Sequence, residues 1–372
     1  MIYLDYAASS PPFPEVISLV SSLSADIYGN PGALHSAGAK SRQILQQSRF
    51  SLARQLQVRP EELFFTSGGT ESNNWAVKIG CSVPGKTHIV CFAAEHSSVL
   101  EPVRRMQQAG YRVSFLPPDS SGYLHPESVE AALQPDTALL CVQAVNNETG
   151  VIQNVDALSD IARRHRVTFF CDAVQGFAQA SQALHKADLI SLSAHKLGGP
   201  RGVGCLVVRQ PLNPAPLLLG GGQEFGARSG TENIPAIAGF SLAAEKSCLR
   251  ENAVQRLQQL LEQGLSALDP RIEIAGRSVS RTAISAVRFP GISGEEMVMR
   301  LDQRGICTSP GAACAARSTA PSHVFLSMGY TPREAAEFVR FSLGRNTTEA
   351  EIQCTVAAVA DIIQKRSQPH GK

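Results

Sequence analysis

Between about Phe64 and Gln210, short apolar runs rich in Val, Ile, Leu and Phe alternate with longer amphipathic stretches. Short apolar runs are typical of strands buried on both faces of a sheet, and amphipathic stretches are typical of the helices that cover it. The alternation predicts an α/β fold with a mostly parallel sheet. The expected strands are His88 to Phe92, Arg112 to Leu116, Ala138 to Ala144, Thr168 to Cys171, Leu189 to Leu192 and Gly204 to Arg209.

Two amphipathic stretches predict covering helices. Within Ala37 to Leu56, Leu45 and Leu52 lie on one apolar face of the expected helix. Within Val155 to Arg166, Leu158 lies on such a face too. Residues 211 to 235 are rich in Pro and Gly, which predicts a long loop at a functional edge. A long helical segment, roughly Pro235 to Leu268, then leads into a section with several further strand candidates. The length of 372 residues exceeds one typical domain, so this last section is expected to be a second, smaller domain.

The charge balance excludes some partners. The 34 Lys and Arg residues nearly match the 32 Asp and Glu residues, and no block of like charges is present, so nucleic acid is not an expected partner. No apolar run reaches membrane-spanning length, and the first residues do not form a signal peptide, so no membrane partner and a cytoplasmic location are expected.

The cysteines are odd in number and scattered, as expected of reduced cytosolic thiols, and none falls at the spacing of a zinc site, so no metal is expected. Cys91, Cys141 and Cys171 lie in apolar runs and are expected to be buried in strands. Cys314 differs, because its neighbours are Gly, Pro and Ala rather than an apolar run. This pattern predicts a loop with an accessible thiol.

Polar residues follow the carboxyl ends of several expected strands. In an open α/β sheet, ligands bind at this edge, so a single site is expected to collect the clusters. Any one cluster has the alternative interpretation of ordinary loop chemistry. The clusters are Glu95 with His96, Asn146 with Asn147, Asp172 with Gln175, and His195 with Lys196.

A run of small residues from Ser67 to Thr70 joins an apolar strand to a helix. The free backbone N–H groups and the Thr70 hydroxyl predict a phosphate-binding turn at the helix start. A strand-to-helix turn capped by Thr is the alternative. Neither a P-loop lysine nor a G-x-G-x-x-G pattern is present, which disfavours a nucleotide as the phosphate bearer.

Lys196 follows an apolar strand, beside a His and before a Gly-Pro turn. A desolvated lysine forms a Schiff base with an aldehyde, although most lysines at strand ends are simply exposed. With the phosphate-binding turn, Lys196 predicts pyridoxal 5′-phosphate (PLP) as cofactor. Asp172 suits the cofactor's pyridinium nitrogen, Gln175 and Asn147 suit its phenolic oxygen, and His96 suits the ring face and proton transfer.

A series of motifs from residue 3 to about 345 resembles the ordered motif set of the cysteine desulfurases, which are NifS- and IscS-like members of the class-V aminotransferase group of PLP enzymes. Together they are specific, whereas each alone is weak. The motifs are Tyr3-Leu-Asp-Tyr-Ala-Ala, Tyr28-Gly-Asn-Pro, Phe65-Thr-Ser-Gly-Gly-Thr-Glu-Ser-Asn-Asn, Glu95-His-Ser-Ser-Val, Val145-Asn-Asn-Glu-Thr-Gly, Asp172-Ala-Val-Gln, Ser193-Ala-His-Lys, Arg228-Ser-Gly-Thr and Arg340-Phe-Ser-Leu-Gly-Arg.

The resemblance implies the PLP-dependent fold type I. Its large domain, residues 15–250, would carry a mainly parallel seven-stranded sheet covered by helices and bind PLP. A smaller α/β domain, residues 1–14 with 251–372, would carry the loop of the catalytic Cys314. In such a fold Lys196 would bear the cofactor, and Gly69, Thr70, Ser193 and His195 would hold its phosphate.

The resemblance also assigns the remaining roles. Asp172 would pair with the ring nitrogen, and His96, Asn147 and Gln175 would surround the ring. Arg340, with Asn147, would bind the substrate carboxylate, and Cys314 would take the sulfur while Lys196 and His96 move protons. Thr231 would reach the phosphate in the other subunit of a homodimer.

The implied activity is removal of sulfur from L-cysteine, giving L-alanine and a persulfide on Cys314. A sulfur-acceptor protein, such as an iron–sulfur scaffold or a thiolation protein, would then receive the sulfur. Selenocysteine lyase remains an alternative, as does another fold type I lyase or aminotransferase, which would not need Cys314. A non-catalytic protein that binds PLP or a partner is a further alternative, and a zinc protein is disfavoured because no ligand set has suitable spacing.

Overall fold

The computed structural model describes residues 1–177, 183–212, 214–247, 251–311 and 320–367. Its main sheet has seven strands in the order β2-β8-β7-β6-β5-β3-β4, and only β8 runs antiparallel to its neighbours. The predicted mainly parallel seven-stranded sheet is therefore confirmed. The strands are β2 (Leu63–Thr66), β3 (His88–Phe92), β4 (Arg112–Leu116), β5 (Thr137–Cys141), β6 (Thr168–Asp172), β7 (Leu189–Ser193) and β8 (Gly204–Val208).

All six expected strands are present, with small differences at their ends. The largest concerns β5, which ends at Cys141 rather than at the predicted Ala144. Beyond Cys141 the N–H groups of Val142 and Ala144 still donate to β6, but on the β3 side the Gln143 N–H donates to the buried Glu95 carboxyl instead of to a strand. The apolar run continues into Val142 and Ala144 because those residues still pack in the core.

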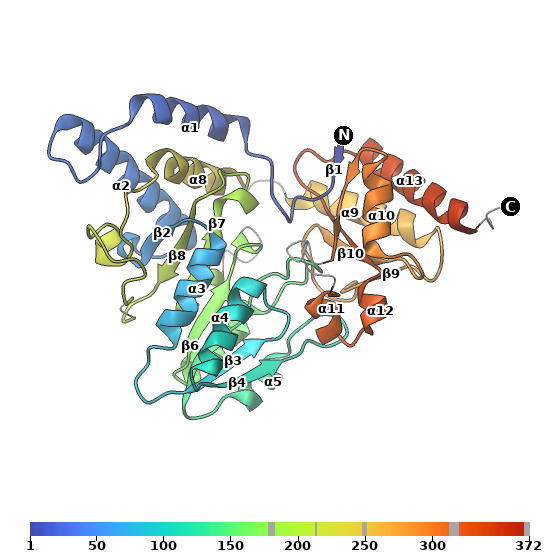
Figure 1. Ribbon diagram of the computed structural model, residues 1–372, viewed down its shortest axis with the longest axis horizontal. Coiled ribbons are helices and arrows are strands. Elements are labelled where there is room, and N and C mark those ends of the chain that lie inside the picture. Colours follow the sequence, from blue (N-terminus) through green and yellow to red (C-terminus); the bar gives the residue numbers. More distant parts are fainter. Residues whose placement is uncertain (178–182, 213, 248–250, 312–319, 368–372) are drawn as a thin grey trace.

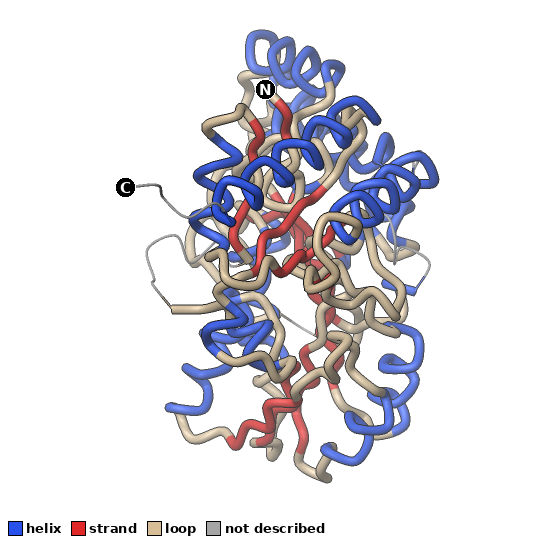
Figure 2. The backbone as a smooth tube through the Cα atoms, turned by 90° about the vertical axis from the view of Figure 1, so that its right-hand side faces the viewer, coloured by secondary structure: helices blue, strands red, loops and turns tan. Residues whose placement is uncertain are grey.

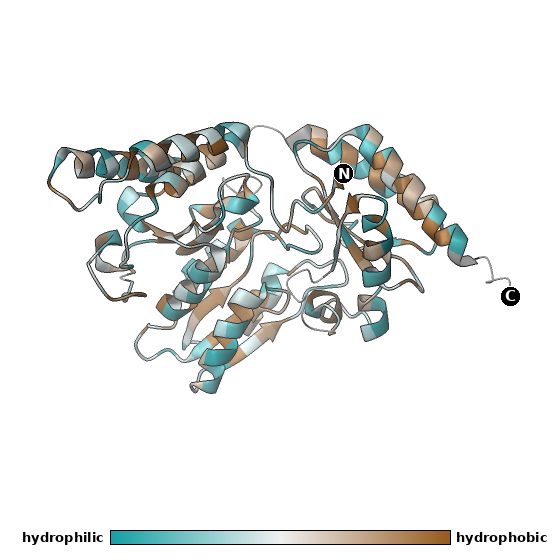
Figure 3. Ribbon diagram, turned by 45° about the horizontal axis from the view of Figure 1, so that its top comes forward, coloured by the Kyte–Doolittle hydropathy of each residue, from teal (hydrophilic) through white to brown (hydrophobic). Residues whose placement is uncertain are grey.

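Helices cover both faces of this sheet because alternate residues of each buried strand point to opposite sides. Along β3, Val90 and Phe92 belong to one core cluster, whereas Ile89 and Cys91 belong to the other. Figure 1 shows the resulting three layers, and Figure 3 shows hydrophobic central strands beneath helices of mixed hydropathy. The helices of the first face include α2 (Ser36–Leu56), α6 (Val155–Arg164) and α8 (Ile234–Ser247), and those of the second are α3 (Gly69–Gly80) and α4 (Ser97–Gln108).

A second lobe is built on a four-stranded antiparallel sheet in the order β12-β13-β10-β9. Its core includes Leu261, Met297 and Val359, which come from three different helices. The strands are β9 (Glu273–Ile274), β10 (Ile284–Arg288), β12 (Ser309–Pro310) and β13 (Phe338–Ser342), and the main helices are α9 (Glu251–Ser266), α10 (Gly294–Asp302) and α13 (Glu349–Ser367). In the tube view, helices surround the strands (Figure 2).

The N-terminus and the helix α13 lie in this second lobe (Figure 1). At the N-terminus, β1 (Ile2–Tyr3) pairs in parallel with β11 (Ile306–Cys307). The chain then crosses to the large sheet, where α1 (Pro14–Asp26) packs against α8. The helical segment predicted from Pro235 to Leu268 is represented by α8 and α9, on either side of residues 248–250. No helix of the described ranges is long and apolar enough to cross a membrane.

Candidate active site

A cavity of about 270 Å³ lies at the carboxyl ends of β6 and β7 and at the start of α3. Each of the four polar clusters predicted at strand exits contributes to its wall. The predicted site residues that line it are Gly69, Thr70, His96, Asn147, Asp172, Gln175, Ser193, His195, Lys196 and Arg340. The structure thus brings together residues spread over most of the sequence.

Two predicted site residues do not line this cavity. Thr231 is exposed on the surface of the single chain. Cys314 lies outside the described residues. Within the clusters, Glu95 and Asn146 also do not line the wall, because each makes buried contacts that hold the surrounding loops. The Asn146 side chain accepts from the N–H groups of Glu148 and Thr149 and donates to the Ala94 carbonyl.

The turn before α3 packs closely against neighbouring segments. Gly68 has a φ of 152°, and a Cβ at Gly69 would lie 2.7 Å from the Val174 side chain. On the facing strand, a Cβ at Gly204 would lie 2.7 Å from the Gly68 Cα, so β8 also approaches this turn closely. The first N–H groups of α3 have no partner within the helix and suit an anion.

Asp172 ends β6 and is buried, at 6% exposure. Its Oδ1 accepts from the Val174 N–H at 2.9 Å, and its Oδ2 accepts from Asn73 Nδ2 at 2.7 Å. Both oxygens of Asp172 thus accept a hydrogen bond, as the oxygens of a carboxylate are able to do. Sequence reasoning missed Asn73 as a site residue, although it lies inside the quoted Ser72-Asn-Asn motif. The two Asn residues of this motif differ in burial, because Asn73 lies on the buried face of α3 and Asn74 is exposed.

Lys196 enters the cavity from the turn after β7. Its Nζ donates to the carbonyls of Ala7, at 2.6 Å, and Ala8, at 3.1 Å. Gln175 Nε2 donates to the same Ala7 carbonyl at 2.7 Å. The N-terminal segment is therefore part of the site, and sequence reasoning missed it because it contributes backbone groups rather than a reactive side chain.

His195 is held neutral at physiological pH. Burial, followed by the nearby charges of Lys196 and Arg201, lowers its pKa from 6.5 to about 4. Its Nδ1 lies 3.4 Å from the Ser9 hydroxyl. A neutral imidazole offers one donor and one acceptor, so His195 is able to donate a single hydrogen bond to an anion.

Arg340 comes from β13 of the second lobe, and only 2% of the residue is exposed. One guanidinium nitrogen, Nη2, contacts the Asp5 carboxylate at 2.8 Å, and Nη1 donates to the Asn147 carbonyl at 2.9 Å. The third nitrogen, Nε, has no hydrogen-bond partner among the described residues. A buried guanidinium held in place by two contacts is suited to binding a carboxylate.

Glu95 is a buried acid behind the cavity. Burial, and then the nearby Cys91 and Asp172, raise the pKa of its carboxyl well above its ordinary value. One of its oxygens accepts from the Gln143 N–H. The raised pKa favours the protonated form of Glu95, which places no second negative charge near Asp172.

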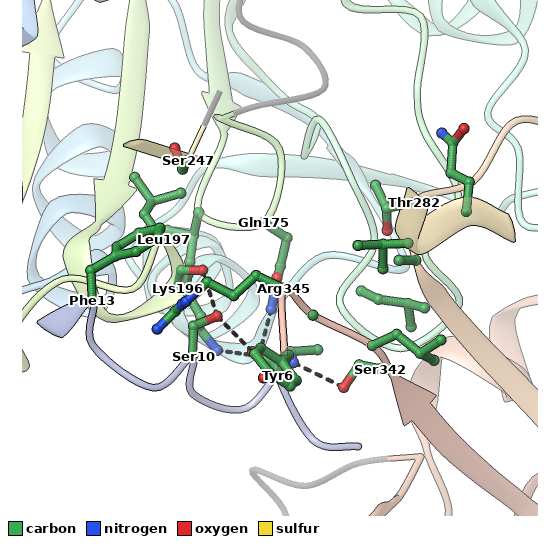
Figure 4. Close-up of a pocket in the computed structure, with 18 residues that line it drawn as sticks. Tyr6, Ser10, Phe13, Gln175, Lys196, Leu197, Ser247, Thr282, Ser342 and Arg345 are labelled. Atoms are coloured by element: carbon green, nitrogen blue, oxygen red, sulfur yellow. Dashed lines mark hydrogen bonds between the residues drawn. The ribbon is translucent and has the colours of Figure 1, made fainter. Parts of the chain in front are cut away.

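A second cavity, of about 200 Å³, lies against the same lysine (Figure 4). It shares Lys196 and Gln175 with the first cavity, and its far wall comes from the second lobe, where it includes Thr282 and Arg345. The Ser10 hydroxyl, drawn beside Lys196 in Figure 4, donates to the Lys196 carbonyl at 2.9 Å. Lys196 therefore stands between two hollows that both reach the junction of the lobes.

Comparison with known proteins assigns this arrangement to a family. The sequence model of the class-V aminotransferases matches residues 2–354. The protein named cysteine desulfurase IscS from Dictyoglomus turgidum is 34% identical, over 98% of this chain and 95% of its own length. This chain belongs to the cysteine desulfurase family. The predicted family is thereby confirmed.

Solved structures of cysteine desulfurases and their relatives share the fold. A NifS-like protein aligns with a TM-score of 0.90 and 32% identity, covering 98% of this chain and 99% of its own. A structure described as SspA in complex with cysteine aligns with a TM-score of 0.82 and 32% identity, covering 92% of this chain and 99% of its own. The two-lobed architecture around Lys196 and Arg340 is thus that of a known enzyme fold.

Proposed function

We propose that this chain is a PLP-dependent cysteine desulfurase, which converts L-cysteine into L-alanine and keeps the sulfur as a persulfide on Cys314. The observation that carries the proposal is the shared wall of one cavity, where Lys196, Asp172 and the turn at Gly69 lie together with Arg340 from the other lobe. Family membership supports the same activity.

The residues of the cavity fit PLP. Lys196 Nζ would bond the aldehyde carbon, and the start of α3 with Gly69, Thr70, Ser193 and neutral His195 would hold the phosphate. Asp172, which accepts N–H donors at both oxygens, would pair with the ring nitrogen, and His96, Asn147 and Gln175 would surround the ring. When bound, PLP supplies an electron sink for the substrate's carbon skeleton.

Substrate binding is assigned to Arg340, assisted by Asn147. Arg340 would pair with the carboxylate of L-cysteine, because it is buried and its direction is set by Asp5 and the Asn147 carbonyl. The amine of Lys196 would accept the proton from the substrate's Cα, and His96 would move protons beside it. These groups remove and return protons but do not carry sulfur.

Cys314 is the proposed sulfur acceptor, on the evidence of its sequence motif. Its thiolate would attack the substrate's sulfur, so that an S–S bond forms and the C–S bond breaks. The electron pair of the broken bond stays with the carbon skeleton, which takes up a proton at Cβ and leaves as alanine. The persulfide sulfur then passes to an acceptor protein, such as an iron–sulfur scaffold or a thiolation protein.

The proposal extends to the organisation of the enzyme. We assign residues 15–250 to the large PLP-binding domain, and residues 1–14 with 251–372 to the small domain. Thr231 is exposed on the single chain and does not line its cavity. This position supports a homodimer in which Thr231 serves the site of the other subunit. We place this enzyme in the cytoplasm.

Replacing Cys314 by Ser tests the proposal. The variant is expected to keep the absorbance of bound PLP and to lose sulfide release and alanine formation from L-cysteine, since only the nucleophile is removed. Cys354→Ser, at an exposed thiol in the second turn of α13, is the matched control and is expected to match the wild type. Unchanged turnover of cysteine by Cys314→Ser would contradict the proposal. Kinetics with selenocysteine beside cysteine would separate this activity from selenocysteine lyase.

A further inference from the structure

A chain of hydrogen bonds, buried at Asn73 and part-buried at His96, runs from Asp172 to His96. Asn73 Nδ2 lies 2.7 Å from Asp172 Oδ2 and 2.8 Å from the Ser98 hydroxyl. The Ser98 hydroxyl in turn lies 2.7 Å from His96 Nδ1. Asn73, Ser98, Asp172 and His96 all line the cavity, and they come from α3, the start of α4 and the end of β6.

The direction of these bonds follows from the chemistry of the groups. With Asn73 turned the other way, its carbonyl oxygen would face a carboxylate oxygen, and two acceptors repel. The amide therefore presents its NH₂ group to Asp172, and the second hydrogen of that group goes to the Ser98 oxygen. Asn73 Oδ1 has no hydrogen-bond partner among the described residues. Within those residues, the Asn73 amide therefore makes its hydrogen bonds through its NH₂ group.

The Ser98 hydroxyl has one hydrogen. Because its oxygen already accepts from Asn73, this hydrogen is available for His96 Nδ1. His96 is also the N-cap of α4, and its Nδ1 accepts from the Ser98 backbone N–H at 3.1 Å. Two donors therefore converge on Nδ1, so in the neutral imidazole the hydrogen sits on Nε2.

We propose that Asn73 is a positioning residue, which joins Asp172 to His96 and holds the neutral His96 in the tautomer with hydrogen on Nε2. This inference rests on the proposed function, in which Asp172 pairs with the cofactor ring and His96 moves protons. Asn73 would then do two things. It would aim the Asp172 carboxylate, and it would leave Nε2 as the nitrogen of His96 whose hydrogen exchanges with the cavity.

The test begins with the wild-type protein. ¹⁵N NMR of the cofactor-free protein, labelled in the histidine rings and assigned with a His96→Gln variant, is expected to show neutral His96 with hydrogen on Nε2. Hydrogen on Nδ1 would overturn the proposal directly. This reading needs neither PLP nor turnover, so it is distinct from a failure of the proposed function, which would appear as a wild-type protein that does not bind PLP.

Asn73→Leu removes both donors at similar volume. The dissociation constant for PLP, measured by titrating the cofactor-free variant, is expected to rise about 10-fold, because Asp172 loses a charge-assisted hydrogen bond. The kcat for cysteine is expected to fall about 10-fold while KM stays within about twofold, because Arg340 still binds the substrate. The control is Asn74→Leu on the exposed face of the same helix, and a PLP affinity and kcat for Asn73→Leu equal to those of this control would overturn the proposal.

A third variant covers the case in which Asn73→Leu fails to fold. Ser98→Ala breaks the chain in the middle and keeps both the partner of Asp172 and the backbone cap on His96. It is expected to bind PLP within about twofold of the wild type and to lose about 5- to 10-fold in kcat, since the hydroxyl bond to Nδ1 is lost. A wild-type kcat in Ser98→Ala would overturn the proposal.

Discussion

Arg340 is buried although it carries a full charge, and its two partners, Asp5 and the Asn147 carbonyl, come from segments far apart in the chain. A planar guanidinium binds a carboxylate through two donors at once, whereas an ammonium provides only a point charge. In the proposed substrate site, the geometry around Arg340 is therefore expected to set the affinity for L-cysteine.

Arg340→Lys is expected to raise KM for L-cysteine by about 10- to 100-fold, because one charge-assisted hydrogen bond to the substrate is lost. Steady-state kinetics measure this change, with PLP absorbance as a check that the cofactor remains bound. Arg333→Lys, at an arginine whose side chain is 87% exposed, serves as the control. A KM for Arg340→Lys within twofold of the wild type would remove Arg340 from the substrate site.

His195 links the stability of the fold to pH. Its pKa is lowered from 6.5 to about 4 in the folded protein, so the unfolded chain binds more protons between these two values. The stability that comes from a neutral His195 is therefore fully present above pH 6.5 and is lost as the pH falls toward 4.

His195→Gln removes this titration. We expect the difference in free energy of unfolding between the cofactor-free wild type and His195→Gln to shift in favour of the variant from pH 7 to pH 4.5. Urea denaturation at both pH values measures the difference. The contributions of other buried histidines, such as His88, cancel because both proteins contain them. A difference that does not change with pH would contradict the lowered pKa.

At the scale of elements, a buried ion pair joins α2 to the short 3₁₀ helix η3 (Glu224–Gly226). Arg49 and Glu224 are both 2% exposed in their side chains and form two bonds, of 2.6 and 2.9 Å. Glu224 also accepts from the Phe65 N–H of β2 at 2.8 Å. The pair thus connects a covering helix, an edge strand of the sheet and a distant loop.

Glu224→Ala is expected to destabilise the protein by about 3–5 kcal/mol, because it leaves the Arg49 charge buried without a counter-ion. The free energy of unfolding in urea measures the loss. Asp160→Ala breaks the exposed Arg163–Asp160 pair and is the matched control, with an expected loss below about 1 kcal/mol. Equal losses in the two variants would show that burial of the Arg49 pair does not decide its contribution.

At the scale of the whole molecule, the proposed homodimer predicts sites shared between subunits. In a heterodimer of Lys196→Ala and Thr231→Ala chains, one site combines an intact Lys196 with an intact Thr231 from the other chain. The heterodimer, purified after coexpression of the two inactive or weakened variants, is therefore expected to have about half the activity of the wild type. Activity no greater than the sum of the two separate variants would place Thr231 in its own chain's site or outside any site.

The sequence allowed much of the large sheet to be predicted, because its signals are local. Buried strands are short apolar runs, and the residues just after them, such as Asp172 and Lys196, lie at one edge in any parallel sheet. The end of β5 was predicted too late, because the apolar run continues past the point where Glu95 takes the Gln143 N–H. No local pattern contains that contact.

The sequence by itself determined the fold class and the family, and it predicted most of the residues that line the cavity, since periodicity, strand-end chemistry and motif order are all properties of short segments. Only the tertiary structure decided which distant groups hold these residues. Asn73 meets Asp172 across 99 residues, and Asp5 meets Arg340 across 335, while backbone carbonyls of Ala7 and Ala8 receive Lys196. Such contacts depend on how separate segments pack, and a hydrogen bond of a few ångströms leaves no periodic trace in the sequence.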